Sequence, residues 1–313
     1  MGVNLQTRVG SVTLKNPVLL ASGCCGYGLE MAPLLDINRV GGICLKGLNM
    51  AGSVGNRPPR IWETRGGMLN AIGLQNIGVP AFKSEVAPQL KAFDTRFVAN
   101  FYGHTLEQYA EAAAALDAET CLAALEMNIS CPNIAQGGIA FGTDPAAVYR
   151  VTKVCREATK KPLWVKLSPN VSDITAPAKA AEEAGADALS CINTIPAMAI
   201  DVEKRIFRLS NQIGGLSGPA LKPVAVRMVY QVARAVKIPV VGIGGIFTAE
   251  DALEFILAGA RAVQVGTALF QDATAPLKIL EGMVAYCERH GVKSVEELVG
   301  QVQAAAPMPR CHG

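Results

Sequence analysis

Short apolar runs alternate along the chain with longer segments in which apolar residues recur every three or four positions. The apolar runs predict buried strands, and they cover residues 18–21, 42–46, 97–100, 125–128, 163–167, 188–193, 240–244 and 262–266. Helical periodicity occupies segments between them, at residues 106–116, 145–158, 174–184, 223–235 and 249–258. Eight such units predict an α/β fold, a (β/α)₈ TIM barrel, rather than a doubly wound sheet.

The start of the chain has a different pattern. Residues 3–7 and 11–14 alternate apolar and polar positions around Gly10, which predicts a short N-terminal β-hairpin before the barrel. No linker or low-complexity segment interrupts the remainder. We therefore expect a single domain over residues 1–313.

Three connections that follow predicted strands are unusually long, at residues 49–80, 132–144 and 194–219. Long loops in compact domains tend to be binding loops or lids. In a barrel all three would lie on the catalytic face.

Composition excludes several classes of function. The 313 residues carry a net charge of +3 and only 18% charged residues, without a basic run, so we expect no nucleic-acid partner. The first residues lack an apolar signal segment, and the apolar runs are too short to span a bilayer. The nine cysteines include no C-x-x-C pair and the three histidines are scattered, so we expect no metal or iron–sulfur site within the chain. A cytoplasmic protein without a membrane partner is the expectation.

The fourth predicted strand leads into the stretch Met-Asn-Ile-Ser-Cys-Pro-Asn, residues 127–133, and a glycine-rich loop follows. Pro132 ends the strand pairing because it has no N–H to donate. Cys131 is thereby held just beyond the carboxyl end of a buried strand, where α/β barrels carry their catalytic groups. A buried inert thiol is the alternative interpretation.

Polar residues also end other apolar strands. Buried lysines and amides are costly without a partner, and these residues are Lys46, Asn100, Asn128, Lys166 and Asn193. Together they predict a polar ligand in the mouth of the barrel. Asn70, Asn128, Asn133 and Asn193 could surround a planar ring bearing carbonyl, N–H and carboxylate groups, because each amide both donates and accepts. Lys46 would supply the countercharge.

The last two strands end in glycines, at residues 242–246 and 266–268. Loops seven and eight form the usual phosphate site of this fold, and glycine lets the backbone approach an anion closely. We expect a phosphate here, with Lys166 beside a cofactor ring.

Several motifs in combination resemble the dihydroorotate dehydrogenase family over about residues 16–269. They are Asn-Ile-Ser-Cys-Pro-Asn (128–133) with Gly-Gly-Ile-Ala-Phe-Gly (137–142), Asn-Ala-Ile-Gly-Leu (70–74), Lys-Leu-Ser-Pro-Asn (166–170), Gly-Gly-Leu-Ser-Gly-Pro (214–219) and Gly-Ile-Gly-Gly (242–245). In having a cysteine at position 131, the chain resembles the class 1 enzymes, because the membrane-associated class has a serine as the base. The stretches 21–23 and 70–76 most resemble class 1B.

The resemblance implies an FMN site and a substrate site. FMN would contact Ser22, Lys46, Gly47, Asn100, Asn128, Lys166, Ile192, Gly218, Gly244, Gly245, Gly266 and Thr267. Dihydroorotate would contact Lys46, Asn70, Ala71, Ile72, Gly73, Leu74, Asn128, Asn133, Asn193 and Thr194. The vicinal pair Cys24–Cys25 departs from the family, where one cysteine is more usual, and we interpret it as core packing.

The resemblance also implies a reaction in de novo pyrimidine (UMP) biosynthesis. Oxidation of (S)-dihydroorotate to orotate would transfer a hydride from C6 to FMN N5 and a proton from C5 to Cys131, the general base. Lys46 would orient the substrate carboxylate. Electrons would pass to NAD⁺ through a partner subunit carrying FAD and a [2Fe–2S] cluster, on a homodimer core within a heterotetramer.

Other functions remain open at this point. A class 1A homodimer would pass electrons to fumarate without a partner, and a dihydropyrimidine dehydrogenase-like subunit would also use a cysteine. A non-redox phosphate-binding isomerase or lyase would use Lys166 as a base or Schiff-base residue. A non-catalytic barrel leaves Cys131 and both lysines without a role.

Overall fold

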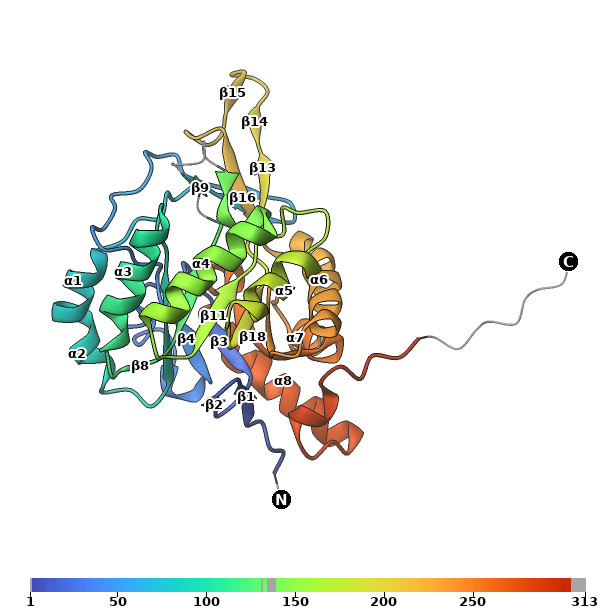
Figure 1. The fold of residues 1–313 in the computed structure, drawn as a ribbon. Coiled ribbons are helices and arrows are strands. Elements are labelled where there is room, and N and C mark those ends of the chain that lie inside the picture. Colours follow the sequence, from blue (N-terminus) through green and yellow to red (C-terminus); the bar gives the residue numbers. More distant parts are fainter. Residues whose placement is uncertain (1, 131, 134–138, 305–313) are drawn as a thin grey trace, which may run out of the picture.

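Eight parallel strands close into a barrel, and the chain visits them in sequence order (Figure 1). The computed structural model describes residues 2–130, 132–133 and 139–304. The barrel strands are β3 (Val18–Leu20), β4 (Gly42–Cys44), β7 (Arg96–Phe101), β8 (Leu122–Asn128), β11 (Leu163–Lys166), β12 (Ala188–Cys191), β17 (Val240–Ile243) and β18 (Ala260–Val265). The predicted TIM barrel is confirmed.

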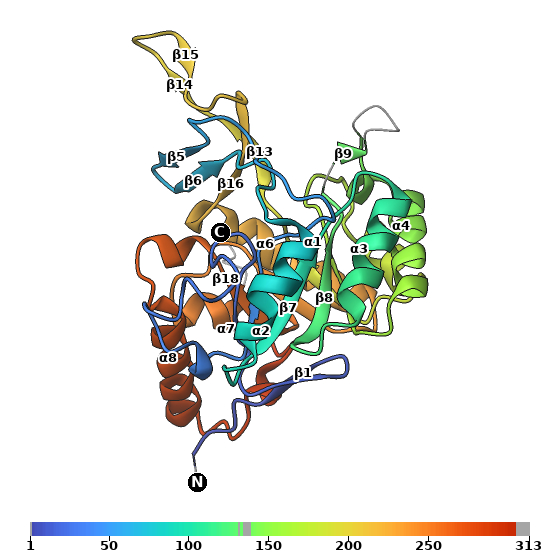
Figure 2. The same ribbon diagram turned by 90° about the vertical axis from the view of Figure 1, so that its left-hand side faces the viewer.

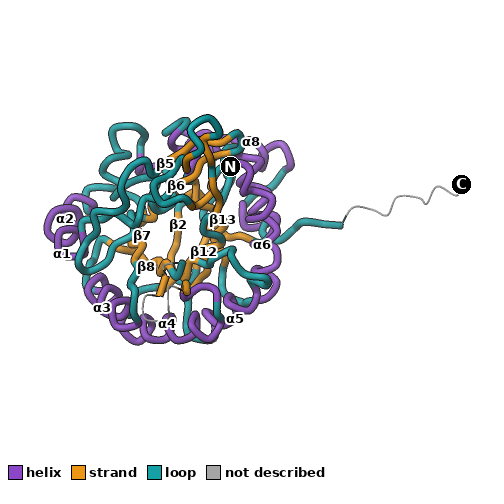
Figure 3. The backbone as a smooth tube through the Cα atoms, turned by 90° about the horizontal axis from the view of Figure 1, so that it is seen from above, coloured by secondary structure: helices purple, strands orange, loops and turns teal. Residues whose placement is uncertain are grey.

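Helices surround the barrel on the outside, as the view from above shows (Figure 3). They are α1 (Gly78–Ala81), η2 (Phe82–Val86), α2 (Ala87–Leu90), α3 (Leu106–Asp117), α4 (Pro145–Ala158), α5 (Thr175–Glu183), α6 (Lys222–Ala235), α7 (Ala249–Ala258) and α8 (Ala275–His290). Shorter turns are η1 (Ile37–Arg39), η4 (Phe141–Thr143), η5 (Pro219–Leu221), η6 (Thr267–Phe270) and η7 (Val295–Leu298). The first strand-to-strand connection holds only η1, so the first unit lacks the α-helix that a regular barrel would have.

Local sequence sets the helix ends. Thr105 accepts a hydrogen bond from Gln108 N at the start of α3, and Asp144 accepts two from the first turn of α4. Gly259, with φ +121°, ends α7. These caps fix where each helix returns the chain to the barrel.

The N-terminal hairpin lies beneath the barrel (Figure 2). It pairs β1 (Thr7–Val9) with β2 (Val12–Leu14), so the expected first arm at residues 3–7 was wrong in its bounds. Gly10, with φ +62°, lies in the turn between Val9 and Val12, which pair with each other. Asn4, expected in the first arm, forms a β-bridge with Ser294 instead. Apolar hairpin residues pack against the lowest part of the barrel interior, and the cluster includes Val9, Val12, Leu14, Leu19, Val98, Ala124, Trp164, Ala188 and Ala262.

A polar tier lies directly above this apolar layer. Alternate residues of a strand face the same side of a sheet, so a residue two positions beyond a member of the apolar layer also points inward. On five strands that residue is polar. These residues are Asn100, Glu126, Lys166, Ser190 and Gln264, and all five are buried. We call them the polar tier.

Two of the long loops join into one antiparallel sheet above the barrel, which we call the rim sheet. Its order is β13 (Ile195–Met198), β16 (Ile213–Ser217), β6 (Gly67–Asn70) and β5 (Ile61–Thr64). The hairpin of β14 (Ile200–Asp201) and β15 (Ile206–Phe207) projects beyond it (Figure 1). The third long loop contains β9 (Pro132–Asn133) and β10 (Ile139–Ala140). The two loops of the rim sheet therefore lie on the catalytic face as expected, whereas residues 134–138 of the third loop lie outside the described residues.

In the part of the chain that the structure describes, no helix combines the length and apolar character needed to cross a bilayer.

Candidate functional site

A cavity of about 800 Å³ opens at the carboxyl ends of the barrel strands. Every barrel strand contributes to its wall within two residues of its carboxyl end, through Ala21, Lys46, Asn100, Asn128, Lys166, Ile192, Ile243 and Gly266. The rim sheet covers it with Ile61, Met68, Asn70, Pro196, Ile213, Gly214, Gly215 and Ser217. This is the face on which barrels of this kind carry their active sites.

The structure brings most of the predicted site residues to this one cavity. The predicted residues that line it are Ser22, Lys46, Gly47, Asn70, Ala71, Ile72, Gly73, Leu74, Asn100, Asn128, Lys166, Ile192, Asn193, Thr194, Gly244, Gly245, Gly266 and Thr267. Gly218 is not in the wall, but a Cβ built on Gly245 would lie 2.7 Å from the Gly218 carbonyl oxygen. Cys131 lies outside the described residues, and Asn133 is described only as part of strand β9.

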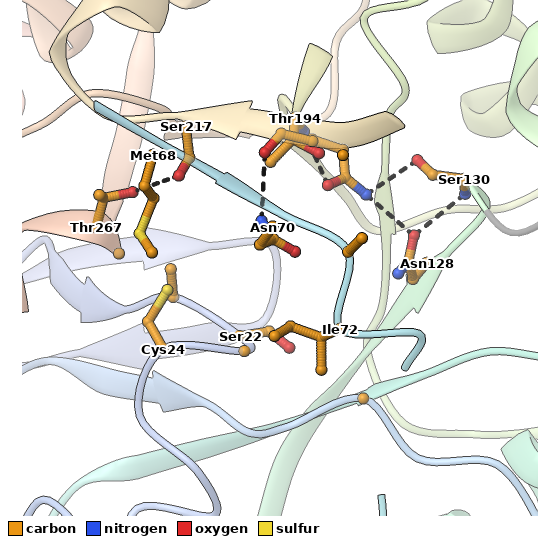
Figure 4. A pocket seen from close by; sticks show the side chains of 18 of the residues that line it. Ser22, Cys24, Met68, Asn70, Ile72, Asn128, Ser130, Thr194, Ser217 and Thr267 are labelled. Atoms are coloured by element: carbon orange, nitrogen blue, oxygen red, sulfur yellow. Dashed lines mark hydrogen bonds between the residues drawn. The ribbon is translucent and has the colours of Figure 1, made fainter. Parts of the chain in front are cut away.

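An amide cluster forms one end of the cavity (Figure 4). Asn193 Nδ2 donates to Asn128 Oδ1 over 3.2 Å and to Ser130 Oγ over 3.0 Å. The side-chain oxygen of Asn193, Oδ1, accepts a hydrogen bond from Thr194 N over 2.9 Å. Both amides are thus fixed in orientation, and among the described residues no acceptor is paired with Asn128 Nδ2. As far as the described residues go, that N–H group can serve a ligand carbonyl or carboxylate.

Ser217 and Thr267 lie at the other end of the cavity (Figure 4). Thr267 Oγ1 donates to Ser217 Oγ over 2.9 Å. Beside them Gly244 and Gly245 have φ values of +124° and +76°, which L side chains rarely adopt. A Cβ on Gly245 would also lie 2.8 Å from Lys222 N. Only glycine fits here, and the backbone is left open to an approaching anion.

Two lysines give the cavity its positive charge. Burial lowers the pKa of Lys46, and the neighbouring cations Arg60 and Lys166 act in the same direction. The ammonium groups of Lys46 and Lys166 donate no hydrogen bond to any residue within the described ranges, although Lys166 Nζ lies 4.0 Å from Glu126 Oε1. Buried cations without hydrogen-bond partners are costly, so the cavity is suited to an anionic occupant.

The side chains of the adjacent residues Cys24 and Cys25 have different surroundings. Cys25 is buried, and its thiol donates to the carbonyl oxygens of Ala21 and Cys44, which agrees with a packing role. Cys24 lines the cavity instead, and burial raises the pKa of its thiol to about 11 against the opposing effect of Lys166 and Lys46. At neutral pH the Cys24 thiol is therefore protonated.

The model of the family described as "Dihydroorotate dehydrogenase" matches residues 4–286 of the chain. The chain belongs to the dihydroorotate dehydrogenase family. Family membership, predicted from the motifs around residues 70–74, 128–142 and 242–245, is thereby confirmed.

Relatives within the dihydroorotate dehydrogenase family match nearly the whole chain. The protein named "Dihydroorotate dehydrogenase B (NAD(+)), catalytic subunit" from Geotalea uraniireducens is 57% identical, covering 95% of this chain and 97% of its own length. The protein of the same name from Trichlorobacter lovleyi is 55% identical, with 96% and 98% covered. That from Pelobacter propionicus is 54% identical, with 97% and 100% covered.

Sequence reasoning missed several residues of this dihydroorotate dehydrogenase-family cavity. Ser130, Met68 and Ser217 line it, and Glu126 lies buried beneath it. The signal for Glu126 was present, because a single carboxylate interrupts the apolar run of β8. A carboxylate in such a position needs partners from other strands.

Proposed function

We propose that this chain is the FMN-binding catalytic subunit of a dihydroorotate dehydrogenase B, which oxidises (S)-dihydroorotate to orotate in pyrimidine biosynthesis. NAD⁺ would be the final electron acceptor. The observation that carries the proposal is one cavity combining an amide cluster, a glycine-lined end and two lysines that have no hydrogen-bond partner among the described residues. The near-full-length similarity to catalytic subunits of that name supports it.

The cavity fits FMN in its donor groups. A phosphate matches the glycine-lined end, where the backbone of Gly244, Gly245 and Gly266 is open and Thr267 offers a hydroxyl. Lys166 lines the cavity at the end of β11, where its charge would stabilise negative charge on a flavin ring. When bound, FMN would supply the hydride acceptor.

The amide cluster fits the substrate. Lys46 would pair with the carboxylate of dihydroorotate, while Asn70, Asn128 and Asn193 would hold the ring by its carbonyl and N–H groups. Asn70 belongs to the rim sheet and its Nδ2 donates to Gly215 O over 3.4 Å. The rim sheet would therefore hold the substrate from above and exclude water from the reacting carbons.

Cys131 is the proposed general base for the C5 proton. It lies outside the described residues, so its support comes from its sequence position, three residues after Asn128 at the end of β8. Its thiolate would take the proton as the hydride leaves C6, and the ring double bond of orotate would form between the two carbons. Two electrons and one proton leave with the hydride, and one proton leaves on sulfur.

Electrons would leave through a partner. We propose a separate subunit carrying FAD and a [2Fe–2S] cluster, bound to a homodimer of this chain in a heterotetramer. The words "catalytic subunit" in the relatives' names support a separate electron-transfer subunit. A cytoplasmic location is supported by the free thiols at Cys24, Cys25, Cys44, Cys121, Cys155, Cys191 and Cys287, which a reducing compartment maintains.

An anaerobic titration of the purified chain tests the proposal. Dihydroorotate should bleach the visible absorption band of the bound flavin, and NAD⁺ should reoxidise it slowly until the partner subunit is added. Rapid reoxidation by fumarate without a partner would instead indicate a class 1A enzyme. A flavin that dihydroorotate does not bleach would indicate another dihydropyrimidine substrate. A colourless protein that binds no FMN would overturn the proposal and favour a non-redox barrel.

A further inference from the structure

Glu126 is a fully buried carboxylate in the centre of the barrel, on the inward face of β8. Its Oε1 accepts from Asn100 Nδ2 over 2.8 Å. Its Oε2 accepts from Ser190 Oγ and from Gln264 Nε2, each over 2.6 Å. Lys166 Nζ lies 4.0 Å from Oε1. The Cys44 thiol also donates to Oε2, over 3.9 Å. One side chain on β8 therefore gathers partners from β4, β7, β11, β12 and β18.

The surroundings of Glu126 match a charged carboxylate. Two amides and a hydroxyl donate to it, the Lys166 ammonium lies 4.0 Å away, and an ionised carboxylate only accepts. A buried charge is expensive and is tolerated when it is hydrogen-bonded and paired. Short contacts to both oxygens meet that condition.

Glu126 does not touch the cavity, but two of its partners do. Asn100 and Lys166 both line the cavity wall, whereas Glu126 is not part of it. Asn128, two residues further along β8, also lines the wall and lies one step above Glu126 on the same face. Any effect of Glu126 on a ligand must therefore pass through these neighbours or through its charge.

The charge of Glu126 acts against that of the lysines. Lys46 and Lys166 place two positive charges at the cavity, and Glu126 places one negative charge directly beneath Lys166. In a buried site such a charge is weakly screened, so it lowers the positive potential that an occupant of the cavity floor experiences.

We propose that Glu126 is a positioning residue that fixes Asn100 and Lys166 and limits how strongly the cavity favours reduced over oxidised flavin. The inference rests on the proposed FMN function. A purely structural role would leave the balance between the two redox forms unchanged when the charge alone is removed. That difference makes the proposal testable.

Glu126→Gln removes the charge at nearly constant size. The deflavinated full-length chain is titrated with oxidised and with reduced FMN, and the ratio of the two dissociation constants is compared with wild type. Loss of the charge should favour reduced FMN by about tenfold. That change corresponds to a rise of about 30 mV in the potential of the bound two-electron couple.

Ser190→Ala is the matched control, because it removes a donor to the same carboxylate but keeps the charge. Its ratio should stay within about twofold of wild type, well inside the tenfold effect. A Glu126→Gln ratio equal to wild type would overturn this inference alone. A wild-type chain that binds no FMN would overturn the proposed function and the redox part of the inference together.

A second measurement covers the case in which Glu126→Gln folds poorly. Lys166→Met leaves the carboxylate without its cation, whereas the double variant Lys166→Met/Glu126→Gln removes both charges. The double variant should unfold at a higher temperature than Lys166→Met in the absence of FMN. A double variant that is no more stable than Lys166→Met would refute the coupling between the two residues.

Discussion

Asn193 donates from its Nδ2 to Asn128 Oδ1 over 3.2 Å, although the two residues are 65 positions apart. Asn193 follows strand β12 and Asn128 is the last residue of β8, and the two strands are separated in the barrel by β11. The bond spans a whole strand and determines which end of the Asn128 amide faces the cavity. Recognition by Asn128 thus depends on a residue from another part of the chain.

Replacing Asn193 should therefore damage substrate recognition through Asn128. Asn193→Ala should lower kcat/KM for dihydroorotate by about tenfold or more, because it removes the part-buried hydrogen bonds to Asn128 and Ser130 and so loosens the Asn128 amide. Asn193→Asp has almost the same shape but no Nδ2 donor, so it should be at least as harmful. Steady-state kinetics on the flavin-loaded protein measure this, and a kcat/KM within twofold of wild type for Asn193→Ala, against the roughly tenfold loss expected, would contradict it.

Cys131 should be needed for turnover and not for cofactor binding. Cys131→Ala should retain FMN and lose about 10²- to 10⁴-fold in turnover, the usual effect of a general base. In wild type the rate should rise with pH until the thiol ionises, near about 8.5 for an ordinary cysteine. Flavin content and a pH–rate profile measure both effects. Near wild-type turnover of Cys131→Ala across the pH range would remove the residue from the mechanism.

Binding of the anionic product should weaken at high pH through Lys46. An anion binds the protonated ammonium, so affinity is fully present below the Lys46 pKa and is lost as the pH rises through it. Burial lowers that pKa below the ordinary value of 10.5, so the loss begins earlier than for an exposed lysine. Orotate titrations across alkaline pH should reveal it.

Lys46→Arg provides the control for this pH dependence, because a guanidinium stays charged throughout the range. Any ionisation of orotate itself affects both proteins equally. Identical pH profiles for wild type and Lys46→Arg would show that Lys46 does not carry the effect.

Gly67 should be essential to the rim sheet. It has φ +153°, and a Cβ there would lie 1.9 Å from the Ser217 carbonyl oxygen. Gly67→Ala should lower the free energy of unfolding by about 1–3 kcal/mol and weaken FMN binding, because β6 and β16 can no longer pair closely. Gly2→Ala, which meets nothing within 4 Å, is the control. Equal denaturation midpoints for the two variants would contradict the prediction.

The barrel was predictable because each of its strands can be recognised from a short segment of sequence. Several apolar runs end in a polar residue such as Lys46 or Asn128, so both the strand and its functional end are visible within a few residues. Helix ends at Gly185 and Gly259 were equally local. The arrangement of most proposed ligand contacts around one cavity followed from these strand ends.

Other features depend on contacts that no local pattern encodes. The pairing of β6 with β16 joins residues about 145 positions apart through glycine-rich segments without alternating polarity, and Asn70 with Gly215 exemplifies it. Glu126 was overlooked because its partners come from five other strands. The first arm of the hairpin was misplaced because residues 3–7 alternate as a strand would, although Asn4 bridges to Ser294 instead.

The rim sheet has a consequence for how this protein can change over generations. Its two halves come from loops after different barrel strands, yet they share backbone hydrogen bonds from Met68 to Asn70 and from Gly215 to Ser217. An insertion or deletion in one loop shifts the register of the other. The two segments must therefore change together during evolution. A chimaera that exchanges only one of them between relatives would lose the rim sheet that covers its cavity.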